Sequence, residues 1–512
     1  MQLQYARSIV ATFTMMLALL VLGGCSQDSF RQTMESMQRE APELKGVKSW
    51  VNTEKPLTLQ DLRGKIVLLD FSTYSCVNCI HIMPFIKSIE RRYPDLVQVI
   101  TVHSGKYANE KEDGYIRDCI DKYNVAHPVC NDADATVWES YGAKAWPTLV
   151  LINPAGKIVG ECSGDSKVAI LDRAIRMLVA DSKETLKKTP PVQTVSRKGA
   201  AVLSFPSKVL AADGNRLFVS DTGHNRLLIT TLDGKIEKVI GAGTAGDADG
   251  DFKTACFNEP TGFCKLGKKL YVADTGNGAI RVVDLDAGTV STFARGEKQG
   301  HVTAAHDGID FDRPSDVVAQ GNQLYVSMNG THKIWQLGLD DNSAHVIAGS
   351  GTEGLKDGVG EVAELAQPEG LCLSGDKLFF VDSESSSVRR LDVKSKEVDT
   401  LVGKGLFEYG DKDGDRKQAL LQHPLGIAVG NGLLYVSDSF NHKIKTVDQT
   451  TGQTATLCGC GHPGYVDGDF PQMCSPTGLS VAGEKLYVAD SNNHRIRVFK
   501  LADGTMSTLS IK

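Results

Sequence analysis

Two features are scarce in this 512-residue sequence: positive charge and long apolar runs. Its 56 Lys and Arg residues are outnumbered by 62 Asp and Glu residues, which gives a formal net charge of −6 at pH 7. A mildly acidic chain lacks the basic surface that neutralises phosphates, so we expect no nucleic-acid partner. The 41% of hydrophobic and 23% of charged residues are typical of a folded, soluble product, and the length predicts at least two domains.

The long apolar run lies at the amino terminus. Residues 8–22 are apolar, follow the basic Arg7, and end in Leu-Gly-Gly-Cys at residues 22–25. The run is too short for a stable membrane anchor and is typical of a signal peptide. Its end resembles a bacterial lipobox, which implies that residues 1–24 are a lipoprotein signal peptide and that Cys25 is lipidated. An ordinary secretory signal or an uncleaved anchor is the alternative.

The same resemblance predicts a location. Ser26 after Cys25 resembles lipoproteins that are sent on to the outer membrane, so we expect an exported protein held in the cell envelope, facing the periplasm. Multiple acyl chains would hold it there stably. Residues 25–40 are polar and read as a tether, with a short helix as an option.

Residues 70–84, Asp-Phe-Ser-Thr-Tyr-Ser-Cys-Val-Asn-Cys-Ile-His-Ile-Met-Pro, form the stretch in which we expect the chemistry. A buried strand is predicted just before it, and apolar residues recur at helical spacing after it. Cys76 therefore falls at a helix N-terminus, where unpaired amides and the helix dipole favour a thiolate. Cys79 lies one turn further on and can close a disulfide with Cys76.

This motif resembles the active site of thioredoxin-like proteins. Asp70 matches the family's buried carboxylate, which assists proton transfer at the second cysteine, and Pro84 matches the kinking proline of the active-site helix. The sequence Ala-Trp-Pro-Thr at residues 145–148 matches the family's cis-proline strand, so Pro147 is expected to hold a substrate backbone beside Cys76 and Cys79. The resemblance thus implies Cys76, Cys79, Asp70 and Pro147 as catalytic residues.

The sequence departs from that family pattern at Ser75, where tryptophan is usual, and at residues 77–78. A redox-silent fold or a zinc site is the alternative for the Cys-x-x-Cys motif. Zinc is disfavoured because no second ligand pair with metal spacing lies nearby, and His81 alone reads as structural. We expect no metal and no cofactor.

Residues 41–182 are expected to form this α/β domain. It has three spare cysteines, of which Cys119 and Cys130 could pair in an oxidising compartment, although buried thiols are favoured. Cys162 is the third. Residues 183–198 are polar, contain two prolines, and read as an interdomain linker.

The remaining residues, 199–512, form a repeat array. Prolines recur at residues 206, 260, 314, 368, 424 and 476, and each opens a similar phrase with four short strands. Units of this kind bury their faces by closing radially. The pattern predicts a six-bladed β-propeller and resembles the NHL-repeat family. Either residues 192–199 or residues 505–511 could supply the strand that closes the ring.

Several polar residues recur within the repeats and read as structural. The recurrent aspartates and histidines lie at turns between strands, and Met328 replaces the aspartate in the third repeat. These residues are Asp221, Asp274, Asp382, Asp438, Asp490, His224, His332, His442 and His494. A disulfide between Cys458 or Cys460 and Cys474 is plausible in an exported protein.

A thioredoxin-like domain followed by such a propeller resembles the family of NHL repeat-containing protein 2, from Val47 to the end of the chain. With the lipobox, the resemblance implies a bacterial lipoprotein relative. The first functional hypothesis is a membrane-tethered thiol-disulfide oxidoreductase whose propeller binds a protein substrate or redox partner. The alternative is a redox-inactive interaction scaffold. A lyase or hydrolase centred on a channel metal is a weaker third idea.

Overall fold

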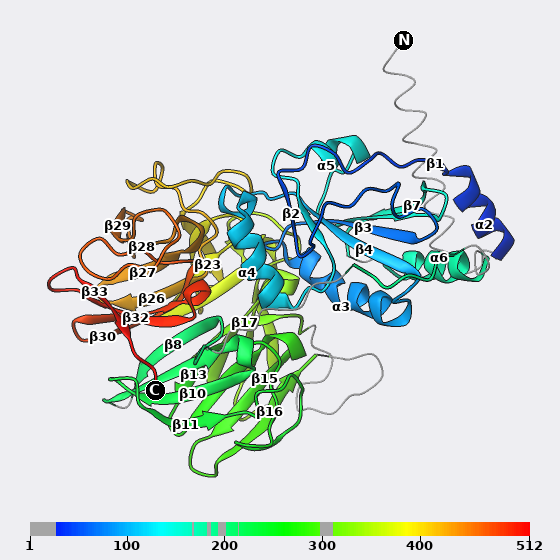
Figure 1. Ribbon diagram of the computed structural model, residues 1–512. Helices are drawn as coiled ribbons and strands as arrows, with labels where there is room; N and C mark the ends of the chain where they lie inside the picture. The colour runs from blue at the N-terminus through cyan, green and yellow to red at the C-terminus, as the bar shows by residue number, and fades with distance from the viewer. Residues whose placement is uncertain are drawn as a thin grey trace. The chain divides into compact units, whose positions relative to one another are not determined.

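The computed structural model describes residues 27–165, 168–181, 186–192, 201–212, 214–296, 311–341 and 343–512. The chain divides into two compact units, Met1–Arg197 and Lys198–Lys512. The first mixes helices with a sheet, and the second, coloured from green to red, is built from strands and short turns (Figure 1). The predicted fold class, an α/β thioredoxin-like domain followed by an all-β six-bladed propeller, is confirmed.

The first unit is built on a seven-stranded sheet with the order β1-β7-β6-β3-β4-β5-β2. The central β3 pairs with β4 in parallel and with β6 antiparallel, and every residue of β3 is buried, as expected for a strand covered on both faces. The strands are β1 (Arg39–Glu40), β2 (Ser49–Val51), β3 (Ile66–Ser72), β4 (Val97–His103), β5 (Val129–Asn131), β6 (Thr148–Ile152) and β7 (Lys157–Ser163).

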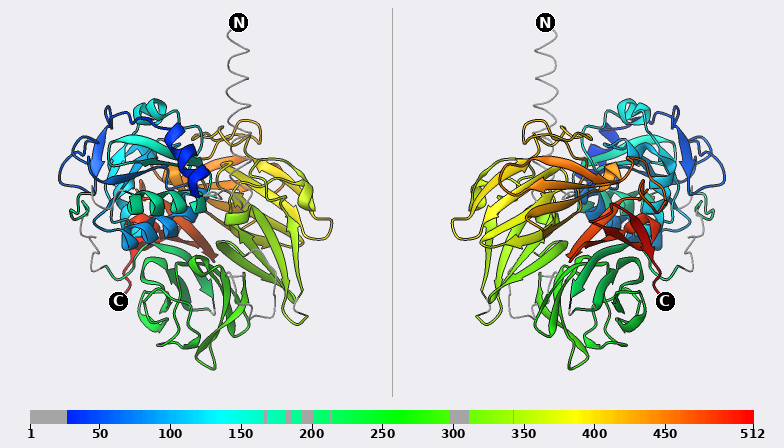
Figure 2. Two further views of the ribbon diagram at one scale, coloured as in Figure 1. Left: turned by 90° about the vertical axis from the view of Figure 1, so that its right-hand side faces the viewer. Right: turned by 90° about the vertical axis from the view of Figure 1, so that its left-hand side faces the viewer.

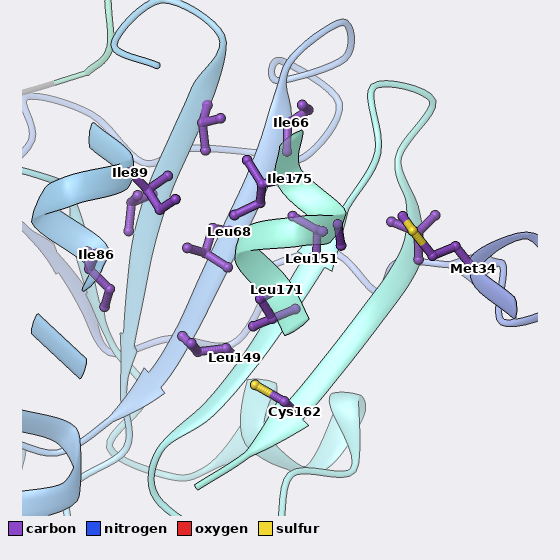
Figure 3. Close-up of a cluster of buried hydrophobic side chains, with 14 of the residues drawn as sticks. Met34, Ile66, Leu68, Ile86, Ile89, Leu149, Leu151, Cys162, Leu171 and Ile175 are labelled. Atoms are coloured by element: carbon purple, nitrogen blue, oxygen red, sulfur yellow. The ribbon is translucent and has the colours of Figure 1, made fainter. Parts of the chain in front are cut away.

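Helices cover the two faces of this sheet. Its helices are α2 (Gln27–Ser36), α3 (Val77–Arg92), α4 (Asp113–Tyr123), α5 (Thr136–Tyr141) and α6 (Val168–Asp181), with a 3₁₀ turn η1 (Asn109–Lys111). Side chains of α3 and α6 pack with those of β3 and β6 in one core, where Leu68, Ile86 and Ile175 meet (Figure 3). A second core on the other face includes α5. The active-site helix α3 is therefore anchored on a rigid sheet.

Helix α2 occupies most of the segment expected to be a polar tether. Its Phe30 and Met34 are only 5% and 9% exposed and pack into the core that α3 and α6 share. Arg31 donates two hydrogen bonds to Asp181 at the end of α6. The short helix that the sequence left as an option in this segment is thus present, and two apolar residues about one helical turn apart pack it against the domain.

Cys25 and the signal peptide lie outside the described residues. Among the helices that the structure does describe, none combines the length and the apolar character needed to cross a membrane.

The described part of the expected linker also lies on the first unit. Leu186 is buried in the core next to α6, and the Lys187 amide donates to the Gly64 carbonyl. The Lys65 ammonium donates to the Thr189 carbonyl, and the Val192 amide donates to the Gln98 side chain. Polarity alone suggested a linker here, but two apolar residues, Leu186 and Val192, and the hydrogen bonds of the backbone bind residues 186–192 to the domain.

The described residues of the second unit form six sheets (Figure 2). In four of them the innermost strand comes first in sequence, and in the two five-stranded sheets a short outer strand, β12 or β21, precedes it. Blades 1 to 3 consist of β8 (Pro206–Ala212), β9 (Arg216–Asp221), β10 (Arg226–Thr231) and β11 (Ile236–Ile240); β12 (Gly250–Asp251), β13 (Pro260–Leu266), β14 (Lys269–Asp274), β15 (Ala279–Asp284) and β16 (Thr289–Arg295); and β17 (Pro314–Gln320), β18 (Gln323–Met328), β19 (Lys333–Gly338) and β20 (Ala344–Ala348). Blades 4 to 6 consist of β21 (Gly358–Val359), β22 (Pro368–Ser374), β23 (Lys377–Asp382), β24 (Ser387–Asp392) and β25 (Glu397–Val402); β26 (Gly426–Gly430), β27 (Leu433–Asp438), β28 (Lys443–Asp448) and β29 (Thr454–Cys458); and β30 (Pro476–Ala482), β31 (Lys485–Asp490), β32 (Arg495–Lys500) and β33 (Met506–Leu509).

The carboxyl-terminal segment supplies the fourth strand of the last blade. Strand β33 pairs with β32, which decides between the two candidate segments in favour of residues 505–511. Beyond it, the Lys512 amide donates to the Gly234 carbonyl, and the Lys512 carbonyl accepts from the Ile236 amide. Of the competing segment, Val192 belongs to the first unit, and residues 193–199 lie outside the described residues.

Recurrent aspartates pair with a buried cation inside the blades. Arg389 is fully buried, donates to the equally buried Asp382 at 3.0 Å, and also donates to Asp357 of the glycine-rich loop at 3.1 Å. The same arrangement recurs in three further blades, with Arg281 on Asp274, Lys445 near Asp438 and Arg497 on Asp490. In blade 3 the two positions hold Met328 and Trp335, both buried. The recurrent aspartates of these blades are therefore structural.

Recurrent histidines form hydrogen bonds to neighbouring blades. The Nδ1 atoms of His332, His442 and His494 accept hydrogen bonds from the backbone amides of Gln367, Ser475 and Phe205, each of which precedes a repeat proline. His224 instead contacts Asp221 of its own blade. These hydrogen bonds give the recurring histidines a structural role that needs no channel metal.

One ion pair crosses the centre of the propeller. The Lys208 ammonium on β8 lies 2.5 Å from the Asp316 carboxylate on β17, and both side chains are almost completely buried. The equivalent position is glycine in the other four blades, at residues 262, 370, 426 and 478. A Cβ atom at Gly262 would lie 2.2 Å from the Asp316 carboxylate, so the innermost strands approach too closely there for a side chain.

Every described cysteine is a free thiol. Cys119, Cys130 and Cys162 are buried, as expected for the first two. The candidate bond from Cys458 or Cys460 to Cys474 is not formed, and Cys458 instead packs into the core shared by blades 5 and 6.

Blade 3 provides a design for testing the buried ion pairs. We expect Arg389→Trp to lower the free energy of unfolding by about 3–5 kcal/mol, because it leaves the Asp382 carboxylate buried without its cation. The double substitution Asp382→Met with Arg389→Trp reproduces the pair found in blade 3 and should cost less than Arg389→Trp alone. Urea denaturation of four proteins measures this: the unsubstituted chain, the single variants Arg389→Trp and Asp382→Met, and the double variant. Simple additivity of the two single costs would contradict the pairing argument.

Candidate active site

Cys76 lies at the N-terminus of α3, directly after the loop that leaves β3. It is the N-cap residue, and its carbonyl accepts hydrogen bonds from the amides of Cys79 and Ile80 at 3.1 and 3.2 Å. Its side chain is partly exposed. The Cys76 sulfur is therefore carried at a helix N-terminus, where it is open to a reaction partner.

Cys79 has the opposite environment. It lies one turn into α3, and only 1% of it is exposed. Burial raises the pKa of the Cys79 thiol well above its usual range, and the neighbouring Cys76 and Asp70 raise it further. The two cysteines therefore differ in the way that an attacking and a resolving thiol must differ.

Asp70 is a buried carboxylate on β3, 5% exposed. Its donors are hydroxyl groups: Ser72 donates to Oδ1, and Thr101 donates to Oδ2 at 3.1 Å. Burial raises the pKa of Asp70, while these hydrogen bonds and the charge of His127 oppose that rise. A carboxyl group with a raised pKa, within electrostatic reach of Cys79, is suited to taking up and returning a proton.

Pro147 lies in the loop that faces Cys76. The Trp146–Pro147 peptide bond is cis, and the Cys76 sulfur lies 3.9 Å from the Trp146 carbonyl oxygen. The Trp146 indole nitrogen donates to the Ser104 carbonyl, and its ring packs on Trp138 at 4.9 Å between centroids. The structure thus brings the Trp146–Pro147 loop to Cys76 and Asp70 within electrostatic reach of Cys79.

A second buried carboxylate, which the sequence analysis missed, fixes the loop before Cys76. Glu110 is completely buried; its Oε1 accepts from the Thr73 hydroxyl at 2.6 Å and from the Ser75 amide at 3.2 Å. Its Oε2 accepts from the amides of Lys106 and Tyr107. No signal in the polar sequence around residue 110 separates this glutamate from an exposed one.

His81 does not join the cysteines in a ligand set. Its Nδ1 lies 2.9 Å from the Asp165 carboxylate, so it has a structural partner within the domain. In the described part of the chain, no group of three or more His, Cys, Asp or Glu side chains is placed to hold a metal ion.

Comparison with known families agrees with this geometry. Residues 64–158 match the thioredoxin-like family, and residues 473–499 match the NHL repeat. The first match contains the two cysteines, Asp70 and Pro147, and the second covers part of blade 6.

Two relatives align with nearly the whole chain. NHL repeat-containing protein 2 of Homo sapiens is 38% identical over 528 residues, which cover 92% of this chain and 71% of that protein. The chloroplastic protein SUPPRESSOR OF QUENCHING 1 of Arabidopsis thaliana is 37% identical over 505 residues, 92% of this chain. The chain spans about half of that protein, 48% of its length.

The thioredoxin-like part alone resembles a bacterial enzyme. Thiol-disulfide oxidoreductase YkuV of Bacillus subtilis is 24% identical over 148 residues, which cover 29% of this chain and 99% of that protein.

Exposure predicts which of the two thiols reacts first. We expect a small alkylating reagent, applied to the reduced protein at mildly acidic pH, to label Cys76 about tenfold or more faster than Cys79, because Cys79 is buried and its pKa is raised. Mass spectrometry of the digested protein locates the label. The Cys79→Ala variant should keep the label on Cys76, and faster labelling of Cys79 would contradict the assignment.

Proposed function

Because the chain belongs to the family of NHL repeat-containing protein 2, we propose that it is a thiol-disulfide oxidoreductase acting on protein thiols and disulfides, with a propeller that binds the protein partner. The observation that carries this proposal is the contrast between a partly exposed Cys76 at the start of α3 and a buried Cys79 one turn later. Asp70 supplies the acid–base group beside them.

The reaction begins at Cys76. In the reducing direction the Cys76 thiolate attacks one sulfur of the substrate disulfide, a Cys76–substrate disulfide forms, and the other substrate sulfur leaves as a thiolate. The N-terminus of α3 favours the thiolate before attack. Glu110 accepts two hydrogen bonds from residues 73–75, while its other oxygen is held by two backbone amides of residues 106–107, and it so sets the direction from which the Cys76 sulfur is presented.

Cys79 completes the exchange. Its thiol gives a proton to Asp70, its sulfur attacks the Cys76 sulfur, the Cys76–Cys79 disulfide forms, and the substrate is released as its second thiolate. The dithiol is oxidised by two electrons, and the substrate disulfide is reduced. The reverse sequence oxidises a substrate dithiol, with Asp70 returning the proton.

The loop at Trp146 and Pro147 is the proposed substrate platform. The Trp146 carbonyl faces the Cys76 sulfur at 3.9 Å, so backbone groups here lie where an extended substrate segment would pass. The hydrogen bond from the Trp146 indole to Ser104 holds this loop in place.

The propeller's proposed role is recruitment. Its recurrent charged residues are used in structural pairs, which leaves binding as its contribution. Holding a partner beside Cys76 would raise its effective concentration to roughly the millimolar range. The lipid on Cys25 would confine the reaction to the membrane surface, with the outer membrane facing the periplasm as the proposed site.

Disulfide exchange by the first unit and recruitment by the propeller can be distinguished by comparing a small disulfide with a protein substrate. We expect residues 27–197 alone to exchange a small aromatic disulfide about as fast as the full chain, yet to form mixed disulfides with protein substrates roughly tenfold less, since only the latter depend on recruitment. The truncated chain must include residues 186–192, which pack on the domain. The Cys79→Ser substitution in both lengths traps the mixed disulfides for counting.

The alternative scaffold function makes a different prediction for the same experiment. A folded full chain that releases no thiol from the small disulfide would favour a redox-inactive scaffold. Equal trapping by both lengths would leave the redox function intact and remove the recruiting role of the propeller. Cys76→Ser is the control, because it removes the attacking sulfur and keeps Cys79.

Anchoring is tested at Cys25. We expect Cys25→Ser to release the protein into the soluble fraction or to leave an unprocessed precursor, because the lipid acceptor is lost. Membrane fractionation and intact mass measure both outcomes. An unchanged mass and an unchanged fractionation would exclude lipidation of this residue.

A further inference from the structure

Three side chains extend from Asp70 in a continuous chain of hydrogen bonds. The Thr101 hydroxyl on β4 lies 3.1 Å from Asp70 Oδ2 and 2.9 Å from Nε2 of His127. Nδ1 of His127 lies 3.0 Å from Oε1 of Glu90 on α3. Asp70, Thr101 and His127 are all buried, with 5%, 2% and 6% exposure, so these contacts are shielded from water.

Counting protons shows that this chain holds one mobile proton. Thr101 contributes a single hydroxyl proton but takes part in two hydrogen bonds, one to Asp70 and one to His127. The second bond needs a proton that resides either on the Asp70 carboxyl or on Nε2 of His127. These two states share the same heavy-atom positions, so a proton can pass between Asp70 and His127 without any side chain moving.

The outer end of the chain reaches a small pocket. Glu90 and His127 line it together with Pro94, Gln98 and Val192. The Glu90 side chain is 15% exposed, more than that of His127 at 7%. The chain thus leads from the buried carboxyl beside Cys79 toward a more open part of the same domain.

We propose that Thr101, His127 and Glu90 form a relay that removes the Cys79 proton from Asp70 during the resolving step and returns it in the reverse step. The inference rests on the proposed oxidoreductase function, in which Asp70 receives that proton. The three residues act through Asp70 and touch neither sulfur, so they are positioning residues for the proton.

The relay balances as follows. The Cys79 thiol gives its proton to Asp70 as its sulfur bonds to Cys76. Asp70 passes a proton to the Thr101 oxygen while Thr101 passes its own to Nε2 of His127. The resulting imidazolium gives up its Nδ1 proton to Glu90, and from there to water at the pocket. One proton leaves the buried site, and the electron pair of the Cys79 sulfur stays in the new disulfide.

Within the described part of the chain, the titratable groups that act on Asp70 are Cys79 of α3, Tyr74 of the loop before α3, and His127. His127 has Glu90 of α3 as its carboxylate partner. A positive charge on His127 favours the ionised Asp70 that accepts the proton.

A single-turnover reaction separates the two chemical steps. The full-length reduced protein is mixed with one equivalent of dithiobis(nitrobenzoate), a chromogenic aromatic disulfide. Attack by Cys76 releases the first coloured thiolate, and attack by Cys79 on the mixed disulfide releases the second. The Cys460→Ser substitution, present in every protein compared, removes the exposed thiol that would also react with the reagent. The measured quantity is the ratio of the second rate to the first, from pH 5 to pH 9.

We expect Thr101→Val to lower this ratio about tenfold or more, because it removes the hydroxyl that connects Asp70 to His127 and keeps the side-chain shape. Thr101→Ser keeps the hydroxyl and should restore the ratio to within about twofold. Thr230→Val is the matched control, since Thr230 is a buried strand hydroxyl of blade 1, outside the relay and the candidate active site. An unchanged ratio in Thr101→Val, or equal losses in Thr101→Val and Thr101→Ser, would overturn the relay.

Glu90→Gln tests the outer end at a partly exposed site and keeps an acceptor for His127. Without the Glu90 charge the proton shifts from His127 onto Asp70, so the midpoint of the pH profile for the second release should move to higher pH. A midpoint equal to that of the unsubstituted chain would argue against Glu90. If the unsubstituted chain releases no second thiolate at all, the oxidoreductase proposal fails instead of the relay.

Discussion

A carboxylate taken out of water must be given hydrogen-bond donors or a counter-charge, and both units are organised around this requirement. In the propeller, Asp382 has a buried arginine and a backbone amide. In the thioredoxin-like domain, Glu110 has one hydroxyl and three amides, which fix the loop before Cys76. Asp70 has two hydroxyl donors and, among the described residues, no cation in direct contact. Asp70 thus has fewer stabilising partners than Asp382 or Glu110. Its ionised form is less strongly stabilised, so Asp70 remains able to take up a proton.

The parts of the site that could be predicted from the sequence are local. A buried strand followed by a helix with Cys76 at its start depends on residues within about two turns of one another, and apolar periodicity reports such neighbours. Pro147 was found because a short strand phrase accompanies it. The propeller was found because its repeat copies the same phrase six times, so that weak strand signals reinforce one another.

The parts that were missed depend on contacts between distant segments. Glu110 lies in a polar stretch that looks solvated, and only the folding of the chain places it under Ser75, 35 residues earlier. Thr101 and His127 come from separate segments, and their shared hydrogen bond has no sequence signature. Phe30 and Leu186 were read as parts of polar segments because one apolar residue carries little weight in composition, although each occupies a place in the core.

The ion pair between Lys208 and Asp316 affects how strongly the blades of the propeller are coupled to one another. In most repeat arrays each unit touches only its neighbours, so a disturbance travels around the ring one blade at a time. Here Lys208 of blade 1 joins Asp316 of blade 3 across the hub, bypassing blade 2. Asp316 also accepts the Leu371 amide of blade 4, so three blades meet at one carboxylate. Blades that are not adjacent are thus connected directly at the centre of the ring. The blades should therefore unfold together instead of one after another.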